Sequence, residues 1–132
     1  MKKVVIIIAL VVIAAGVAAY FLFLAPQPEA KLMYYTPGDY FVTNIKDSTA
    51  LIKTTIVLEL LVMDMEETEV YLKENNHIIR DVIVFTLRSK TEDELRSQGV
   101  ESSLRQEIVK NIKDKMGLDY LQTIYFNDYV IQ

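Results

Sequence analysis

An uninterrupted apolar run extends from Val4 to Leu24 and contains no Asp, Glu, Lys, Arg or His. A helix over this segment is roughly 32 Å long, enough to cross the hydrocarbon core of a bilayer. The pattern therefore predicts a transmembrane helix over 4–24, in contact with membrane lipid. A cleaved signal peptide is the alternative interpretation, with Val17-Ala18-Ala19 as its cleavage site.

The charges that flank the apolar run predict how the helix is oriented. Lys2 and Lys3 precede the run, whereas the nearest charges beyond it, Glu29 and Lys31, cancel. Because basic residues are enriched on the cytoplasmic side of membrane helices, we expect residues 1–3 in the cytoplasm. Everything after the helix is then expected to lie outside the cytoplasmic membrane.

Two prolines follow the apolar run and favour an extended backbone. We therefore expect a short, stiff linker over residues 25–39 and a single folded extracytoplasmic domain over 40–132. Tyr34 and Tyr35 lie within the predicted linker and are candidate contacts for a partner or for the membrane interface. The alternative is that they pack on their own domain.

The domain begins with two segments that have the composition of β-strands. Tyr40–Ile45 is rich in aromatic and β-branched residues, and Asp47-Ser48 after it is a turn signal. The segment Leu51–Met63 then alternates, which predicts a long strand and a hairpin. Its mainly apolar face comprises Ile52, Thr54, Ile56, Leu58, Leu60 and Val62.

The pattern in the middle of the domain predicts helix. Residues 65–90 carry apolar side chains at helical spacing, although the β-branched segment Asp81–Leu87 leaves a strand as an alternative. Thr91 and Glu94 have the spacing of a capping box, so a short helix is expected to begin there.

A longer helix and a last strand follow. The helix is expected over 100–116, with Gly117 ending it. The segment Tyr120–Gln132 is a predicted strand. The order of elements predicts an α+β fold, with an antiparallel or mixed sheet and helices packed on it.

Charge and cysteine content narrow the possible partners. With Lys2 and Lys3 set aside, 12 basic and 18 acidic residues leave the outer domain with a net charge of about −6. This charge argues against a nucleic-acid partner. The chain has no Cys, so an exported domain depends on its core and forms no disulfide.

No catalytic or metal-binding pattern stands out. His77 is the one histidine and has no recognised ligand set around it, and the acidic residues 64–69 lack the spacing of a calcium loop. The sequence contains no nucleophile motif and no phosphate-binding loop. We therefore expect neither an enzyme nor a cofactor.

The membrane helix itself gives two further expectations. It has no ionisable side chain and so is not expected to carry ions itself. Small residues recur four positions apart, the spacing that allows membrane helices to approach closely. The predicted helix contact comprises Ala14, Ala15, Ala18 and Ala19.

Five segments in this order resemble the flagellar basal-body-associated protein FliL family: YFVTNIKDS (40–48), LIKTTIVLEL (51–60), HIIRDVIVFTLRSKTEDELRS (77–97), LRQEIVKNIK (104–113) and YFNDYVIQ (125–132). The resemblance covers nearly the whole chain. Arg80-Asp81 matches a family pattern, from which the chain departs in carrying Arg88 before Ser89.

The resemblance implies a scaffold at the flagellar motor in the cytoplasmic or inner membrane. Proteins of this family associate with the ion-driven stator units and support torque, swimming, swarming or chemotaxis. Their outer domain is similar to the stomatin/SPFH domain, which forms rings. The resemblance thus implies an oligomeric ring around the outer part of the stator, with stator contact expected in the linker 25–39.

On this ring hypothesis, one face of the predicted 65–90 helix is the candidate oligomer or partner contact. It carries Arg80, Asp81 and Val84, the last being a predicted exposed apolar residue among charged neighbours. Substituting Arg80 or Val84 with an acidic residue is then expected to weaken oligomers without unfolding the domain. A membrane-anchored sensing or ligand-binding module unrelated to the motor is the competing function.

Overall fold

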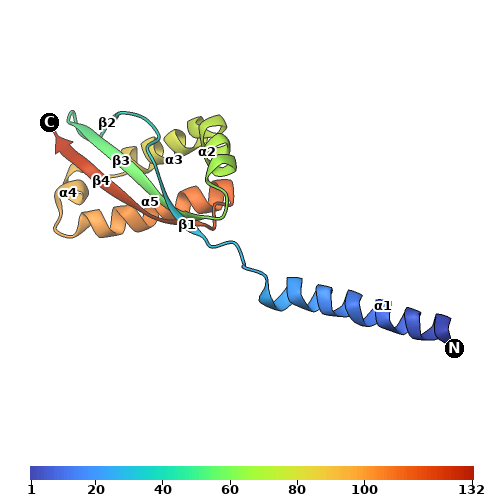
Figure 1. Cartoon of the computed structure of the whole chain (residues 1–132). Helices are drawn as coiled ribbons and strands as arrows, with labels where there is room; N and C mark the ends of the chain where they lie inside the picture. Colours follow the sequence, from blue (N-terminus) through green and yellow to red (C-terminus); the bar gives the residue numbers. More distant parts are fainter.

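The apolar run forms a helix that stands apart from the rest of the chain (Figure 1). The computed structural model describes residues 1–132. Helix α1 spans Lys2–Ala19 and continues as a π-helical segment, η1, over Tyr20–Leu24. Residues 2–24 are long and apolar enough to cross a membrane, and none of their side chains is buried against the domain. The predicted helix over 4–24 is confirmed as a candidate membrane span.

The outer domain is built on one antiparallel sheet whose central strand is β3. The strands are β1 (Lys31–Tyr35), β2 (Phe41–Asn44), β3 (Leu51–Val62) and β4 (Leu121–Ile131). Strand β2 pairs with the beginning of β3 and β1 pairs with its end, while β4 pairs along nearly all of it. Both short strands therefore lie in line on one side of β3, and β4 lies on the other. The predicted hairpin of β2 and β3 is confirmed.

The predicted linker over 25–39 is wrong for residues 31–35, which form strand β1. Met33 lies opposite Leu60 and is buried, so the strand contributes to the core. Its alternation of exposed and buried residues is short, and it is recognisable as a strand only through its pairing with β3. Only residues 25–30 separate the membrane helix from the domain.

Four helices follow in two pairs along the chain: α2 (Met65–Glu74), α3 (Asn76–Arg88), α4 (Glu92–Arg96) and α5 (Val100–Met116). The helix expected over 65–90 is thus two helices that meet at Asn75, whose side chain donates to the carbonyl of Tyr71. The strand alternative for 81–87 is wrong. The expected bounds of α5 are confirmed. The helix ends at Gly117, which has a positive φ that a glycine adopts without strain.

The helices cover one face of the sheet, with α5 packed on β4 and α3 packed on β2 (Figure 1). The predicted apolar face of β3 is confirmed, since every second residue from Ile52 to Val62 is buried. These residues join a core of 19 buried apolar side chains drawn from all strands and from α2 to α5. The opposite face of the sheet has no helix over it.

Candidate interaction surfaces

The alanines of the membrane helix lie on an unpartnered surface. Ala14 and Ala18, like Ala15 and Ala19, are about one helical turn apart on α1 and exposed in this chain. Small side chains at this spacing allow two helix backbones to approach closely, which favours packing between membrane helices. The predicted contact between membrane helices stays a prediction, and the alanines that would make it are exposed.

Arg80 is held within its own domain. Its guanidinium donates to the carbonyl of Pro37 at 2.8 Å and to that of Tyr40 at 3.4 Å. It also lies over the ring of Phe41, 4.4 Å from the ring centroid. The side chain therefore fastens the connection between β1 and β2 onto α3. The expectation that Arg80 can be reversed in charge without harm to the domain does not fit these contacts.

The two adjacent tyrosines of β1 have different environments. Tyr35 donates to the carbonyl of Leu72 and to the amide oxygen of Asn76, at 3.3 and 3.0 Å, so it packs on its own domain. Burial raises the pKa of its hydroxyl. Tyr34 points to the uncovered face of the sheet and is 58% exposed. Of the two, Tyr34 is the residue available to a partner.

The face of α3 also differs from the expectation at Val84. This side chain is half-buried and packs against the core, so the prediction of an exposed valine is wrong. The next residue, Phe85, is the large apolar side chain that α3 exposes. Asp81 is exposed and lies with Phe85 along a polar groove of about 470 Å³ between α3 and α5.

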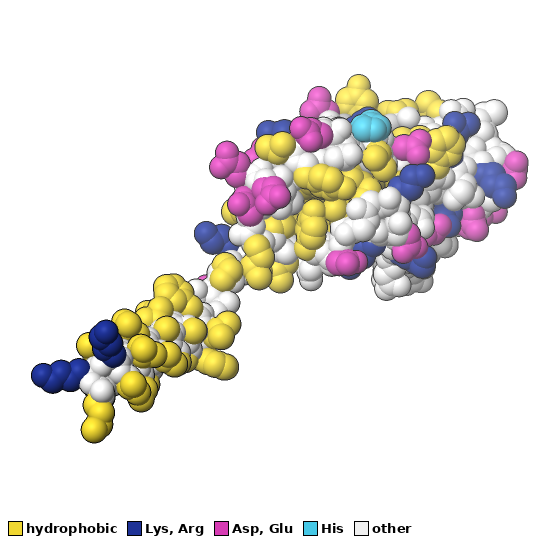
Figure 2. All heavy atoms as spheres, turned by 90° about the vertical axis from the view of Figure 1, so that its right-hand side faces the viewer, with side chains coloured by type: hydrophobic (Ala, Val, Ile, Leu, Met, Phe, Trp, Pro, Cys, Tyr) yellow, Lys and Arg dark blue, Asp and Glu magenta, His cyan; other side chains and the backbone are white.

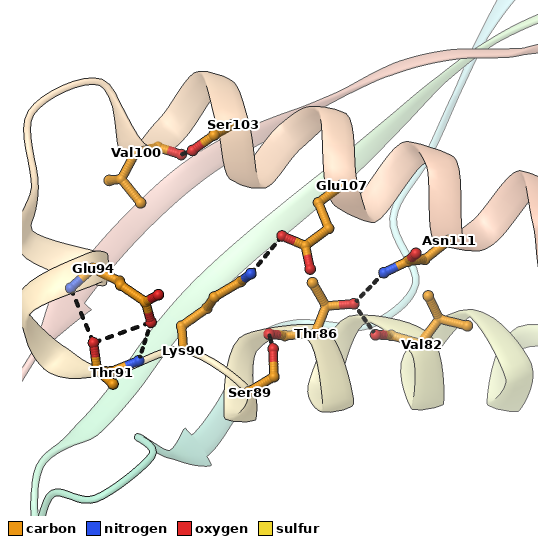
Figure 3. Close-up of polar contacts among 10 residues, drawn as sticks. All are labelled: Val82, Thr86, Ser89, Lys90, Thr91, Glu94, Val100, Ser103, Glu107 and Asn111. Carbon is orange, nitrogen blue, oxygen red and sulfur yellow. Dashed lines mark hydrogen bonds and ion pairs between the residues drawn. The ribbon is translucent and has the colours of Figure 1, made fainter.

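Polar contacts fasten α3 to α5 beneath this groove (Figure 3). The hydroxyl of Thr86 is buried, donates to the carbonyl of Val82 at 2.8 Å and accepts from the side chain of Asn111 at 3.1 Å. Lys90 forms an ion pair with Glu107 at 2.6 Å. These groups satisfy one another, so they hold the two helices together.

The predicted capping box at the start of α4 is confirmed (Figure 3). The hydroxyl of Thr91 accepts from the backbone of Glu94, and the carboxylate of Glu94 accepts from the backbone of Thr91 at 2.7 Å. These bonds favour the charged form and hold the pKa of the Glu94 carboxyl below its ordinary value of 4.5.

A pH dependence follows from the capping box. A carboxyl whose pKa is lower in the folded state stabilises the fold above its ordinary pKa, and this contribution is lost as the pH falls below about 4.5. We expect Glu94→Gln to be less stable than the parent at neutral pH and to approach it in acid. Urea unfolding at a series of pH values measures this, with Glu101→Gln as an exposed control that makes no side-chain hydrogen bond. Parallel pH profiles of the parent and Glu94→Gln would contradict it.

The uncovered face of the sheet carries tyrosines around a carboxylate. Tyr34 lies opposite Glu59, and Tyr125 of β4 donates to the same carboxylate at 2.9 Å. The hydrogen bond to Glu59 raises the pKa of Tyr125, and the carboxylate raises that of Tyr34 as well. Leu32 and Leu61 are paired beside them and are 54% and 40% exposed. Exposed tyrosine and apolar groups of this kind are typical of protein interfaces.

The end of the domain nearest the membrane helix contains a cleft of about 460 Å³, which we term the base cleft. It lies where β3 ends and β4 begins, between α2 and the end of α5. Burial raises the pKa of Tyr120 in its wall. Its lining consists of Leu61, Val62, Met63, Asp64, Glu67, Thr68, Tyr71, Met116, Gly117, Leu118 and Tyr120.

Sequence reasoning missed two of these surfaces, the uncovered face of the sheet and the base cleft, and a sequence signal exists only for the first. The second face of β3 carries Leu51, Val57, Leu61 and Met63, more apolar residues than a face left to solvent requires. The base cleft has no local signal, because its walls come from segments far apart in the chain. The acidic residues 64–69, which lack the spacing of a calcium loop, lie at the start of α2, where Asp64 accepts from the backbone of Glu67 and caps the helix.

The structure defines a class of protein: a small α+β domain carried close behind one candidate membrane-spanning helix, with open surfaces for contact. No group of three His, Asp or Glu side chains is placed to hold a metal ion, and His77 is exposed on α3. The comparisons with known proteins give the particular family. Residues 34–132 match the model of the flagellar basal body-associated protein FliL, and the chain belongs to this family of flagellar accessory proteins.

A curated relative agrees with this assignment. The chain is 28% identical over 105 residues to the flagellar protein FliL of Aquifex aeolicus (strain VF5). The alignment covers 80% of this chain and 64% of the relative. The chain therefore spans less than two thirds of the length of that relative. The resemblance noted in the sequence is confirmed at the level of the family.

Proposed function

We propose that this protein is a non-enzymatic accessory subunit of the flagellar motor that associates with the stator units in the membrane. It forms an oligomeric ring there and supports stator assembly, activation and torque. Membership of the FliL family and the candidate membrane span support this function. The observation that carries it is the short connection between the helix and the sheet.

This connection limits how far the domain can reach. Residues 25–30 join Leu24 to the first residue of β1, and they span roughly 20 Å at most when fully extended. The base of the domain is thus held next to the membrane surface, where it meets the outer segments of neighbouring membrane proteins. A domain held at this height suits a brace around a stator better than a receptor that samples distant ligands.

The proposal includes the orientation and the fold class of the domain. Lys2 and Lys3 favour an amino terminus in the cytoplasm, and in this proposal the domain is therefore extracytoplasmic. The antiparallel sheet with helices on one face is compatible with a stomatin/SPFH-like module. Ring formation then uses the domain surfaces described above, while the alanine face of α1 contacts other membrane helices.

Co-purification tests the proposed function directly. The full-length protein, solubilised from membranes with detergent, is expected to retain both stator proteins and to appear as rings by electron microscopy. The control is a chain in which residues 4–24 are replaced by an unrelated membrane helix, which is expected to keep the domain and lose part of the stator. A monodisperse monomer without stator proteins, in every detergent tried, would overturn the proposal.

A substitution on α1 tests the alanine face by itself. Ala18→Leu adds bulk where two helices are expected to approach, so the recovery of stator proteins should fall severalfold. Ala9→Leu makes the same change on the opposite side of the helix, nine residues and thus half a turn away in direction, and should leave recovery unchanged. Quantitative immunoblotting of the purified membranes measures both. Equal recovery from the two variants would exclude the alanine face as a contact.

A further inference from the structure

The base cleft is an open apolar site at the end of the domain that faces the membrane. Its floor includes Val62 and Leu118, which are buried, while Met63 and Tyr71 in its walls are 65% and 39% exposed. Large exposed apolar side chains beside a hollow are typical of a surface that another molecule covers. Figure 2 shows hydrophobic side chains gathered on this face, near the membrane helix and beside a group of acidic side chains.

The position of the cleft follows from strand pairing. Lys31, the first residue of β1, lies opposite Val62, and Val62 and Met63 line the cleft. The cleft is therefore at the same end of the domain as the connection to the membrane helix, as the path of the chain in Figure 1 shows. With residues 25–30 as the only spacer, an occupant must come from the membrane surface or from a protein segment just above it.

The charges of the cleft select among occupants. Asp64 and Glu67 line it, and no Lys, Arg or His does. Neither carboxylate forms an ion pair within the chain, whereas Glu69 on the same helix pairs with Lys73. Apolar walls beside carboxylates that have no basic partner within the chain are complementary to an apolar segment that also carries a basic side chain.

The same charges disfavour the two other occupants. An anionic lipid surface is repelled by the acidic residues of the α2 amino terminus. A second copy of the domain brings its own net charge of about −6, so it meets this acidic rim with like charge. A segment of a different protein avoids both costs.

We propose that the base cleft is the docking site for an amphipathic juxtamembrane segment of another membrane protein. The segment binds through apolar side chains between α2 and the start of β4, and through one Lys or Arg that pairs with Glu67. The proposal rests on the proposed function, in which the chain is anchored beside a stator, and it names the chemistry of the segment that the domain recognises.

The chain offers a clean way to observe this binding. It has no Cys, so Val70→Cys introduces a single thiol for a fluorescent dye on α2, at an exposed position beside the cleft that does not line it. Full-length labelled protein in nanodiscs of zwitterionic lipid is titrated with two short synthetic amphipathic peptides. One peptide carries leucine and lysine, and the other carries glutamate in place of lysine.

We expect the lysine peptide to bind about tenfold more tightly than the glutamate peptide, since one charge-assisted contact distinguishes them. Glu67→Lys should remove this preference or reverse it. Glu66→Lys is the matched control, because it makes the same change of charge in the same first turn of α2 but lies outside the cleft lining. It should alter the affinity less than twofold. Met63→Gln should weaken both peptides, whereas Met65→Gln, outside the lining, should not.

Several results would overturn the proposal. Equal binding of the two peptides, or equal effects of Glu66→Lys and Glu67→Lys, would leave only general electrostatic attraction. A dye signal that changes with protein concentration alone would identify a second copy as the occupant, and one that changes with anionic lipid alone would identify the membrane. Specific peptide binding without recovery of stator proteins would support the cleft as a docking site and overturn the proposed function. Recovery of stator proteins without specific peptide binding would support the proposed function and overturn the docking site.

Discussion

Replacing Arg80 with glutamate is expected to lower the free energy of unfolding by roughly 2–4 kcal/mol. The substitution removes two hydrogen bonds from a charged donor to backbone carbonyls, and it removes the stacking on Phe41. It also places a carboxylate beside the carbonyl oxygens of Pro37 and Tyr40, which cannot donate to it. The connection between β1 and β2 should then detach from α3 while the strands remain paired.

Urea unfolding of the full-length protein in detergent, followed by tyrosine fluorescence, measures this loss. Arg88→Glu is the control, because Arg88 is exposed near the end of the same helix and makes no hydrogen bond through its guanidinium. It should cost about 1 kcal/mol or less, through its unfavourable position at a helix carboxyl end. If Arg80→Glu unfolds like the parent and only weakens oligomers, Arg80 is a partner contact as the sequence suggested.

The close approach at Gly38 explains why the contacts of Arg80 with the β1–β2 connection are sensitive to substitution. This glycine has a φ of +142°, and a Cβ at this position would come within 2.1 Å of the Arg80 guanidinium. The arginine therefore fits only where the backbone lacks a side chain. The sequence motif Pro37-Gly38-Asp39 reads as an ordinary turn, and nothing local reveals that an arginine from α3 lies against it.

Replacing Leu58 with alanine is expected to destabilise the domain by about 2–5 kcal/mol. Leu58 is fully buried in the middle of β3, where it faces the helices, and truncation leaves a cavity that the surrounding core fills only in part. A small domain has a total stability of roughly 5–15 kcal/mol, so this loss is a large share of the whole. The variant should show a clearly lower urea midpoint.

Val57→Ala is the matched control on the same strand. Val57 points to the uncovered face of the sheet and is only half-buried, so we expect a cost near 1 kcal/mol. Both substitutions replace an aliphatic side chain of β3 with alanine. The comparison therefore separates the effect of burial under the helices from the effect of strand propensity. Equal losses at the two positions would mean that the second face is covered too, either by a copy of the chain or by a partner.

The elements that could be predicted from the sequence are those with local signals. The capping box at Thr91 and the glycine at 117 fix helix ends through hydrogen bonds and backbone conformations confined to a few residues. The alternation in β3 fixes which face is buried, since the side-chain period of a strand is two. The break at Asn75 was missed because α2 and α3 both have helical spacing, and only their packing shows that the axis changes.

The sequence by itself determined the long apolar helix, the apolar face of β3 and the extent of α5, because hydrophobic patterning and glycine conformations act within each segment. Only the tertiary structure decided that residues 31–35 join the sheet, since five residues gain a register only from the strand beside them. The tertiary structure likewise showed that Arg80 holds the connection between β1 and β2 against α3. The base cleft exists because β3, α2, α5 and β4 meet at one end of the domain, a meeting that long-range pairing creates.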